Sequence, residues 1–137
     1  MNIKEIRPEA FNAHRVFATA VAPKVITPLQ AELIKIRISQ INGCLFCLDM
    51  HTTKAIQLGE TIRRLTALPV WREAPHFTKE EKAMFELAEK LTLIHSYEQP
   101  YHDTIDVLGE EAATDVLMTT VVINSWNRIM KNSGLLP

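Results

Sequence analysis

The chain has 137 residues, of which 47% are hydrophobic and 23% charged, and its net charge is −1. This length fits a single domain, residues 1–137, that can bury a core without disulfide staples or metal ions. The near-neutral charge gives no electrostatic footprint for nucleic acid or an anionic membrane, and no apolar run approaches the roughly 20 residues of a membrane span, so we expect neither partner.

The first ten residues bear on where the protein works. Residues 1–10 carry charges where a signal peptide would have its apolar region, so we expect a cytoplasmic location. Structural disulfides are rare in that compartment. Two nearby cysteines there indicate redox or metal chemistry rather than a structural cross-link.

Helical patterns account for the chain, which has only four glycines and no strand-like alternation of useful length. The first predicted helix covers residues 8–21, with Pro8 in its first turn. The second begins at Thr27, where Thr27 and Gln30 match a capping box. Its apolar residues fall on more than one face, which predicts burial on several sides.

The remaining predicted helices follow at short spacings, and Gly59 and Gly109 stand where two of them end. They cover a stretch that begins at residues 43–45 and ends near residue 59, residues 61–67, a stretch that opens at the capping box of residues 78–81, residues 101–108, and residues 111–131. A loop is expected over residues 69–75. The sequence therefore predicts an all-α protein, a compact bundle of about six to seven helices.

The two cysteines, Cys44 and Cys47, have a Cys-x-x-Cys spacing, and His51 follows four residues later. On a helix these three residues share one face, so the sulfur atoms can approach closely enough for a disulfide. The helix dipole favours a thiolate at Cys44, while His51 lies one turn beyond Cys47 and can accept its proton. Glu32, on the preceding helix, can return beside this face and orient the imidazole. The pattern predicts dithiol–disulfide chemistry.

Two other interpretations fit the same residues. Free cysteines at this spacing can be small buried core residues. Glu32, Cys44, Cys47 and His51 are also four plausible metal ligands, although structural zinc sites usually draw ligand pairs from two segments and no second Cys/His pair is present.

Other polar and aromatic residues lack such a context. The remaining histidines are interpreted as structural or surface residues: His14, His76, His95 and His102. Trp71 and Trp126 are interpreted as packing residues. Asn124, Asn127 and Arg128 on the last helix can reach either the site or a subunit contact, and their spacing does not decide which.

The motif resembles the core motif of alkylhydroperoxidase D-like proteins, within the carboxymuconolactone decarboxylase superfamily. The residues that carry the resemblance are Glu32 and the run Ile41-Asn42-Gly43-Cys44-Leu45-Phe46-Cys47-Leu48-Asp49-Met50-His51. The resemblance to the family extends to residues 59–61, 71–75 and 123–128, so it covers most of the chain.

This resemblance implies an all-α fold that forms homo-oligomers, typically trimers or hexamers, and a peroxiredoxin-type activity that reduces hydroperoxides. By position, Cys47 would be the peroxidatic cysteine and Cys44 the resolving cysteine, while Glu32 and His51 would form the proton relay that activates Cys47. The expected partners are a hydroperoxide substrate and a dithiol reductant, either a protein or a small thiol, with no cofactor and no metal ion.

The chain departs from the family pattern at one position. The best-studied pattern has a histidine directly before the second cysteine, where this chain has Phe46, so one member of the relay is missing. The decarboxylase branch generally lacks the paired cysteines, which argues against lactone decarboxylation. Apolar neighbours of the cysteines, among them Leu45 and Met50, indicate a pocket for an organic hydroperoxide rather than a charged substrate.

Three alternatives to peroxidase activity stay open at this stage. One is a non-enzymatic protein whose dithiol senses redox state, and another is a metal-binding oligomeric protein. The third is another acid–base reaction of the superfamily that uses Glu32 and His51.

Overall fold

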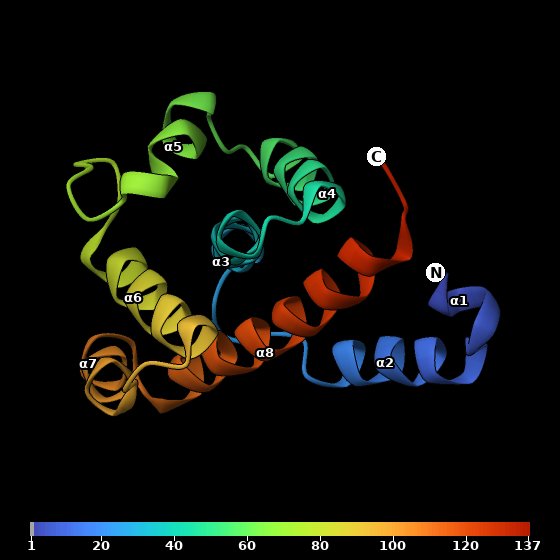
Figure 1. Cartoon of the computed structure of the whole chain (residues 1–137). Coiled ribbons are helices and arrows are strands. Elements are labelled where there is room, and N and C mark those ends of the chain that lie inside the picture. The colour runs from blue at the N-terminus through green and yellow to red at the C-terminus, as the bar shows by residue number, and fades with distance from the viewer. Residues whose placement is uncertain (1) are drawn as a thin grey trace.

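Eight α-helices and one 3-10 helix, with no strand, make up residues 2–137, the part of the chain that the computed structural model describes (Figure 1). In chain order they are α1 (Ile3–Ile6), α2 (Pro8–Ala20), α3 (Pro28–Asn42), α4 (Leu45–Gln57), α5 (Ile62–Ala67), η1 (Leu68–Val70), α6 (Lys79–Leu93), α7 (Glu98–Leu108) and α8 (Glu110–Ser133). None of these helices combines the length and apolarity that crossing a membrane requires. The all-α prediction is confirmed.

The predicted element list differs from the structure in three places. The structure contains all seven predicted helices and adds α1, whose four residues are too few to show a helical period. The expected loop over residues 69–75 contains most of the short η1. The helix predicted over residues 101–108 begins at Glu98 instead, because Pro100 falls in its first turn, where no backbone N–H is needed.

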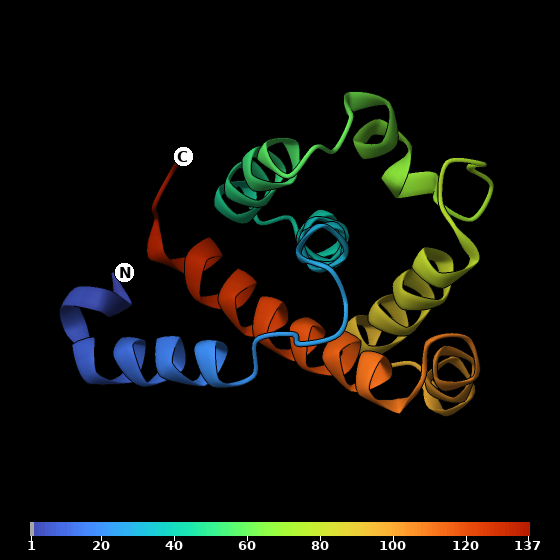
Figure 2. The same cartoon turned by 180° about the vertical axis from the view of Figure 1, so that it is seen from behind.

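α3 is the central helix, and both views show it nearly end-on with α4, α5, α6 and α8 around it (Figure 1, Figure 2). The capping box fixes its start: Gln30 N–H donates to Thr27 Oγ1 at 3.2 Å, and Thr27 N–H donates to Gln30 Oε1 at 2.8 Å. Leu33 and Ile34 are both fully buried, and further buried residues follow on other faces of the helix. Burial on several sides, expected from the apolar pattern, is confirmed.

Polar side chains join the end of α3 to α8. The buried Asn127 donates to Ser39 Oγ at 2.9 Å, and Asn42 donates to the Oδ1 atoms of Asn127 and Asn124, also at 2.9 Å. Asn124 and Asn127 therefore bind α3, and neither lines the cavity described below. Because these bonds fix Asn42, they also fix the turn that follows it and leads into α4.

The first two helices form an arm, the α1–α2 arm (residues 3–20), in which no residue is buried. It runs beside α8 in both views (Figure 1, Figure 2). The rings of Phe11 and His14 lie 5.3 Å and 4.3 Å from that of Trp126 on α8. After the arm, three successive backbone N–H groups, from residues 24–26, donate to Asp115 Oδ2. The arm is thus attached to α8 mainly by aromatic contact and at the base by one carboxylate.

We expect Asn127→Ala to lower the free energy of unfolding by roughly 2–3 kcal/mol, since it leaves the buried hydroxyl of Ser39 without its donor and removes one of the two bonds that Asn42 donates to α8. Chemical denaturation of the oxidised protein measures this loss. The control is Gln57→Ala at the end of α4, where the side chain is exposed and the change should stay within about 0.5 kcal/mol. Equal effects of the two substitutions would contradict the structural role of Asn127.

Candidate active site

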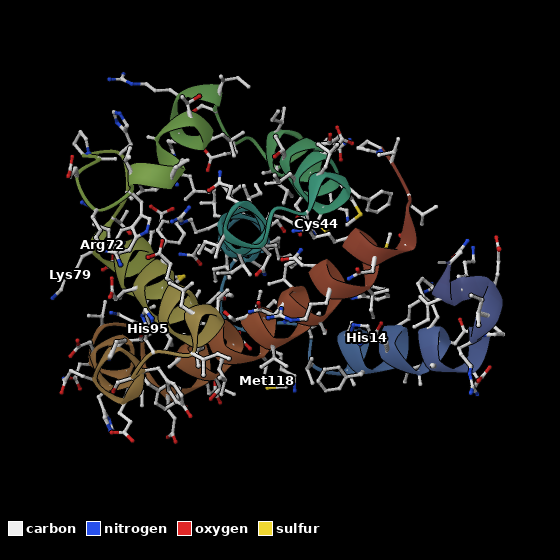
Figure 3. All side chains as sticks on the ribbon, in the orientation of Figure 1. His14, Cys44, Arg72, Lys79, His95 and Met118 are labelled. Carbon is white, nitrogen blue, oxygen red and sulfur yellow. A yellow bond between two sulfur atoms is a disulfide. The ribbon has the colours of Figure 1, made fainter. Side chains whose placement is uncertain are left out.

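Cys44 and Cys47 are joined by a disulfide at the start of α4, where Figure 3 labels Cys44 between α4 and α8. Their Cα atoms are 5.4 Å apart, within the usual range for a disulfide, and each residue is only 1% exposed. Cys44 is the N-cap of this helix, with extended backbone angles, which agrees with the start predicted at residues 43–45. The reason is Gly43, whose φ of 65° ends α3 and turns the chain directly into α4.

Both sulfur atoms lie at the positive end of the α4 dipole. Cys47 is the third residue of α4, and its N–H donates to Cys44 Sγ at 3.4 Å. Unpaired backbone N–H groups and the helix dipole stabilise a thiolate at such a position once the disulfide is reduced. The local backbone therefore favours ionisation of both cysteines, and the dipole alone does not choose between them.

His51 and Glu32 meet beside the disulfide although they are 19 residues apart. His51 lies one turn after Cys47 on α4, and its Nδ1 is 2.6 Å from Oε2 of Glu32, which comes from α3. The other carboxylate oxygen of Glu32, Oε1, accepts a bond from Lys35 Nζ at 2.8 Å. The structure thus brings together all four residues that the sequence singled out, in the chain order Glu32, Cys44, Cys47 and His51.

The charge state of Glu32 fixes the tautomer of His51. Burial raises the pKa of Glu32, but the hydrogen bonds from His51 and Lys35 and the charge of Lys35 outweigh it and lower the pKa from 4.5 to about 2. An ionised carboxylate only accepts hydrogen bonds, so Nδ1 of His51 must be the donor. The second ring nitrogen, Nε2, is the one left to take up or release a proton.

A cavity of about 550 Å³ opens beside Cys47 and His51, between the α1–α2 arm, α4 and α8. Cys47 lines this cavity, but Cys44 does not. Most of the wall is apolar, and the side chains that form it include Phe11, Phe46, Met50, Ile123, Trp126 and Met130. Phe46, which occupies the position of the family's histidine, therefore forms part of the apolar wall.

The sequence did not identify most of the cavity. Trp126 was interpreted as a packing residue, and it does pack on Phe11 and His14 while also forming part of the wall. Segments more than 70 residues apart in the chain form this wall, so no local pattern marks it. Lys35 was also missed, although its i,i+3 spacing from Glu32 is a recognisable helix ion pair and could have indicated it.

The geometry supports the redox interpretation of these four residues better than the metal-binding one. Among residues 2–137 no group of three or more His, Cys, Asp or Glu side chains is arranged to hold a metal ion. Of the four candidate ligands, Cys44 and Cys47 are bonded to each other. A metal would therefore need the reduced protein and rearranged ligands.

Comparison with known proteins gives the family. A sequence model described as the carboxymuconolactone decarboxylase family matches residues 8–90, more than half of the chain. The chain belongs to this family. The matched range contains the disulfide, His51 and Glu32, whereas the part of the cavity wall that α8 forms lies outside it.

Relatives of this family member are known mainly by sequence and fold. The uncharacterized protein YdfG of Bacillus subtilis is 42% identical over 128 residues, which are 91% of this chain and 87% of that protein. A crystal structure from Agrobacterium tumefaciens, of a protein of unknown function with a suggested assignment as the antioxidant defence protein AhpD, has 28% identity and a TM-score of 0.91. It covers 100% of this chain and 97% of that one.

A second solved structure supports the fold alone. The alkylhydroperoxidase AhpD core of an uncharacterized peroxidase-related protein from Ralstonia eutropha is 21% identical, with a TM-score of 0.84 over 98% of this chain and 73% of that one. Together with the family match, these neighbours show a member of the carboxymuconolactone decarboxylase family with an alkylhydroperoxidase D-like fold.

We expect Glu32→Gln to destabilise the protein at neutral pH and to lose this effect in acid. The folded-state pKa of Glu32 is about 2, below its ordinary 4.5, so the ionised carboxylate stabilises the fold above pH 4.5. That stabilisation, on the order of 3 kcal/mol, is lost as the pH falls towards 2. Urea denaturation of both proteins across this pH range measures the difference.

The control for this experiment is Glu73→Gln, which removes an exposed carboxylate that forms no ion pair within residues 2–137. Its effect should stay within about 0.5 kcal/mol at every pH. A loss in Glu32→Gln that does not change with pH would show that the substitution acts through packing and not through charge.

Proposed function

We propose that this protein is a thiol-dependent peroxidase that reduces organic hydroperoxides through the Cys44–Cys47 pair. The observation that carries the proposal is the position of Cys47, in the wall of an apolar cavity and one helical turn from His51. Family membership and the likeness to the Agrobacterium protein support the same reaction class.

The first step consumes the hydroperoxide. Nε2 of His51 takes the proton of the Cys47 thiol, through a bridging water, while Glu32 holds Nδ1 and stabilises the imidazolium. The thiolate attacks the terminal oxygen of the hydroperoxide, the O–O bond breaks, and the departing alkoxide receives the proton from Nε2 of His51 to become an alcohol. Cys47 is left as a sulfenic acid, oxidised by two electrons.

The second step forms the disulfide and the third removes it. Cys44 attacks the sulfenic sulfur of Cys47, and water leaves with a proton from the Cys44 thiol. A dithiol reductant then attacks the disulfide, passes through a mixed disulfide and leaves as its own disulfide, which returns two thiols to the protein. In sum, one hydroperoxide and one dithiol give one alcohol, one water molecule and one oxidised reductant.

Cys47 is assigned the peroxide-reactive role for two reasons. It lines the cavity, whereas Cys44 does not, so a substrate in the cavity meets Cys47 first. His51 is also in helical register with Cys47, and a positioned base outweighs the partial charge of a helix terminus.

The proposal predicts separate outcomes for the two cysteines. In reduced protein treated with cumene hydroperoxide, Cys47→Ser should abolish peroxide consumption. Cys44→Ser should consume one equivalent and stop, because Cys47 gains one oxygen atom that no second thiol removes. His51→Gln should slow the reaction roughly 100-fold, the size expected for loss of a positioned base. Thiol titration and intact-mass measurement report the thiol content and the added oxygen in each variant.

Other outcomes would favour the alternatives. Unchanged turnover in Cys47→Ser would reject the peroxidase assignment. Activity on another substrate that survives in the double cysteine variant would instead indicate acid–base chemistry by Glu32 and His51. Slow peroxide reaction with a clear change of assembly on oxidation would indicate a redox sensor.

We also propose that the chain forms a homo-oligomer, a trimer or hexamer, through the α1–α2 arm. A 13-residue helix is only marginally stable alone, and no residue of α2 is buried within the single chain. Val16, on α2, is 69% exposed, and Ile6 and Phe17 are also exposed. Burial of this apolar face against a second copy would remove it from water.

Size-exclusion chromatography with light scattering measures the mass of the assembly and so tests this proposal. We expect Val16→Glu to lower the measured mass to that of a smaller species, because a charge would enter the contact. The matched control is Val70→Glu, since Val70 is 61% exposed on η1, outside the arm. Loss of assembly in Val70→Glu but not in Val16→Glu would assign the contact to another face.

A further inference from the structure

The cavity wall carries basic side chains but no acidic one. Of the residues that line it within the described range 2–137, four are basic and none is Asp or Glu. The basic residues are Lys4, Arg15, Lys35 and Lys54. The whole chain has 16 acidic and 15 basic residues, so this lining differs from the average composition.

Three of the four basic groups have no acidic partner. Lys35 is paired with Glu32 at 2.8 Å. Lys4, Arg15 and Lys54 form no ion pair in the described part of the chain, and all three are exposed. They come from α1, α2 and α4, so three separate elements contribute free positive charge to the lining of one cavity. An anionic group in this cavity would find complementary charge on several sides.

The register of α4 places this charge at a defined distance from the sulfur. Cys47, His51 and Lys54 lie at offsets of zero, four and seven residues and all line the cavity, so they share one face of α4. Seven residues correspond to about 10 Å along a helix axis. His51 and the apolar Met50 lie between Cys47 and Lys54 on the same helix, and most of the remaining wall is apolar. A substrate that reaches both Cys47 and Lys54 would carry a negative charge at one end and its reacting group about 10 Å from that charge.

We propose that the cavity takes amphipathic carboxylates and that the substrate class is the hydroperoxide of a fatty acid. The apolar chain lies along the wall, the hydroperoxide meets Cys47, and the carboxylate lies among Lys54, Arg15 and Lys4. The chemical step rests on the proposed function. One fatty-acid hydroperoxide and one dithiol give one hydroxy fatty acid, one water molecule and one oxidised reductant. This inference differs from the expectation of an uncharged substrate. The apolar wall fits the chain of such a molecule, but the basic side chains favour an anionic group at its end.

The first test compares a long-chain fatty-acid hydroperoxide with its methyl ester, which has the same chain and the same reacting group. In the wild-type protein kcat/KM should be at least about ten-fold higher for the acid. Added salt should reduce this ratio, because exposed charges are screened. Equal kcat/KM for acid and ester would overturn the inference, while turnover of either compound would leave the proposed function standing.

The second test removes the charges one at a time. Lys54→Gln and Arg15→Gln should each lower the acid-to-ester ratio by roughly two- to five-fold, the size expected for exposed charge pairs. The matched control is Lys79→Gln on α6, an exposed lysine on the opposite side of the molecule from His14 (Figure 3), which should leave the ratio unchanged. A ratio that survives both cavity substitutions would overturn the assignment of these residues.

Binding without chemistry separates this inference from the proposed function. Titration calorimetry of the oxidised protein should give a dissociation constant for decanoate at least about ten-fold below that for 1-decanol, and Lys54→Gln should narrow the difference. If no hydroperoxide is turned over but decanoate binds in this way, the peroxidase proposal fails and the anion site stands. If decanoate binds no better than 1-decanol, the anion site fails whatever the activity.

Discussion

Glu32 lies on the central helix α3, next to the fully buried Leu33, and is itself only 6% exposed. An isolated ionised carboxylate in such surroundings would be strongly unfavourable. Hydrogen bonds from His51 and Lys35 offset the penalty, and the bond from His51 also holds α4 against α3. The same contact fixes the imidazole next to Cys47. Stability of the bundle and geometry of the site therefore depend on one buried ionic contact.

The backbone around this contact leaves the cysteines little freedom. The side chains of Asn42, Asn127 and Ser39 attach the end of α3 to α8, and Gly43 then turns the chain into α4. The disulfide follows at once, so its position relative to His51 is set by two rigid helices and a one-residue turn. Sites on such elements are held more precisely than sites on loops.

The sequence predicted the features that depend on short spacings. The capping box at Thr27 and the helical class follow from local chemistry, and the motif with its resemblance named the four residues that meet. It did not predict α1, which is too short to show a period, nor the helical start before Pro100. The sequence could not predict the cavity either, because its wall is formed by segments that are distant in the chain. Its exposed basic residues are single side chains on three different helices, which no local pattern connects.

Lys4 and Leu135, close to the two ends of the chain, both line the cavity. Figure 1 shows the N and C marks on the same side of the molecule, next to α8. A purification tag fused at either end would therefore introduce foreign residues next to the entrance. A polyhistidine tag would bring additional imidazoles there, and an acidic epitope tag would neutralise the lysines. Assays on protein with the tags removed avoid both effects.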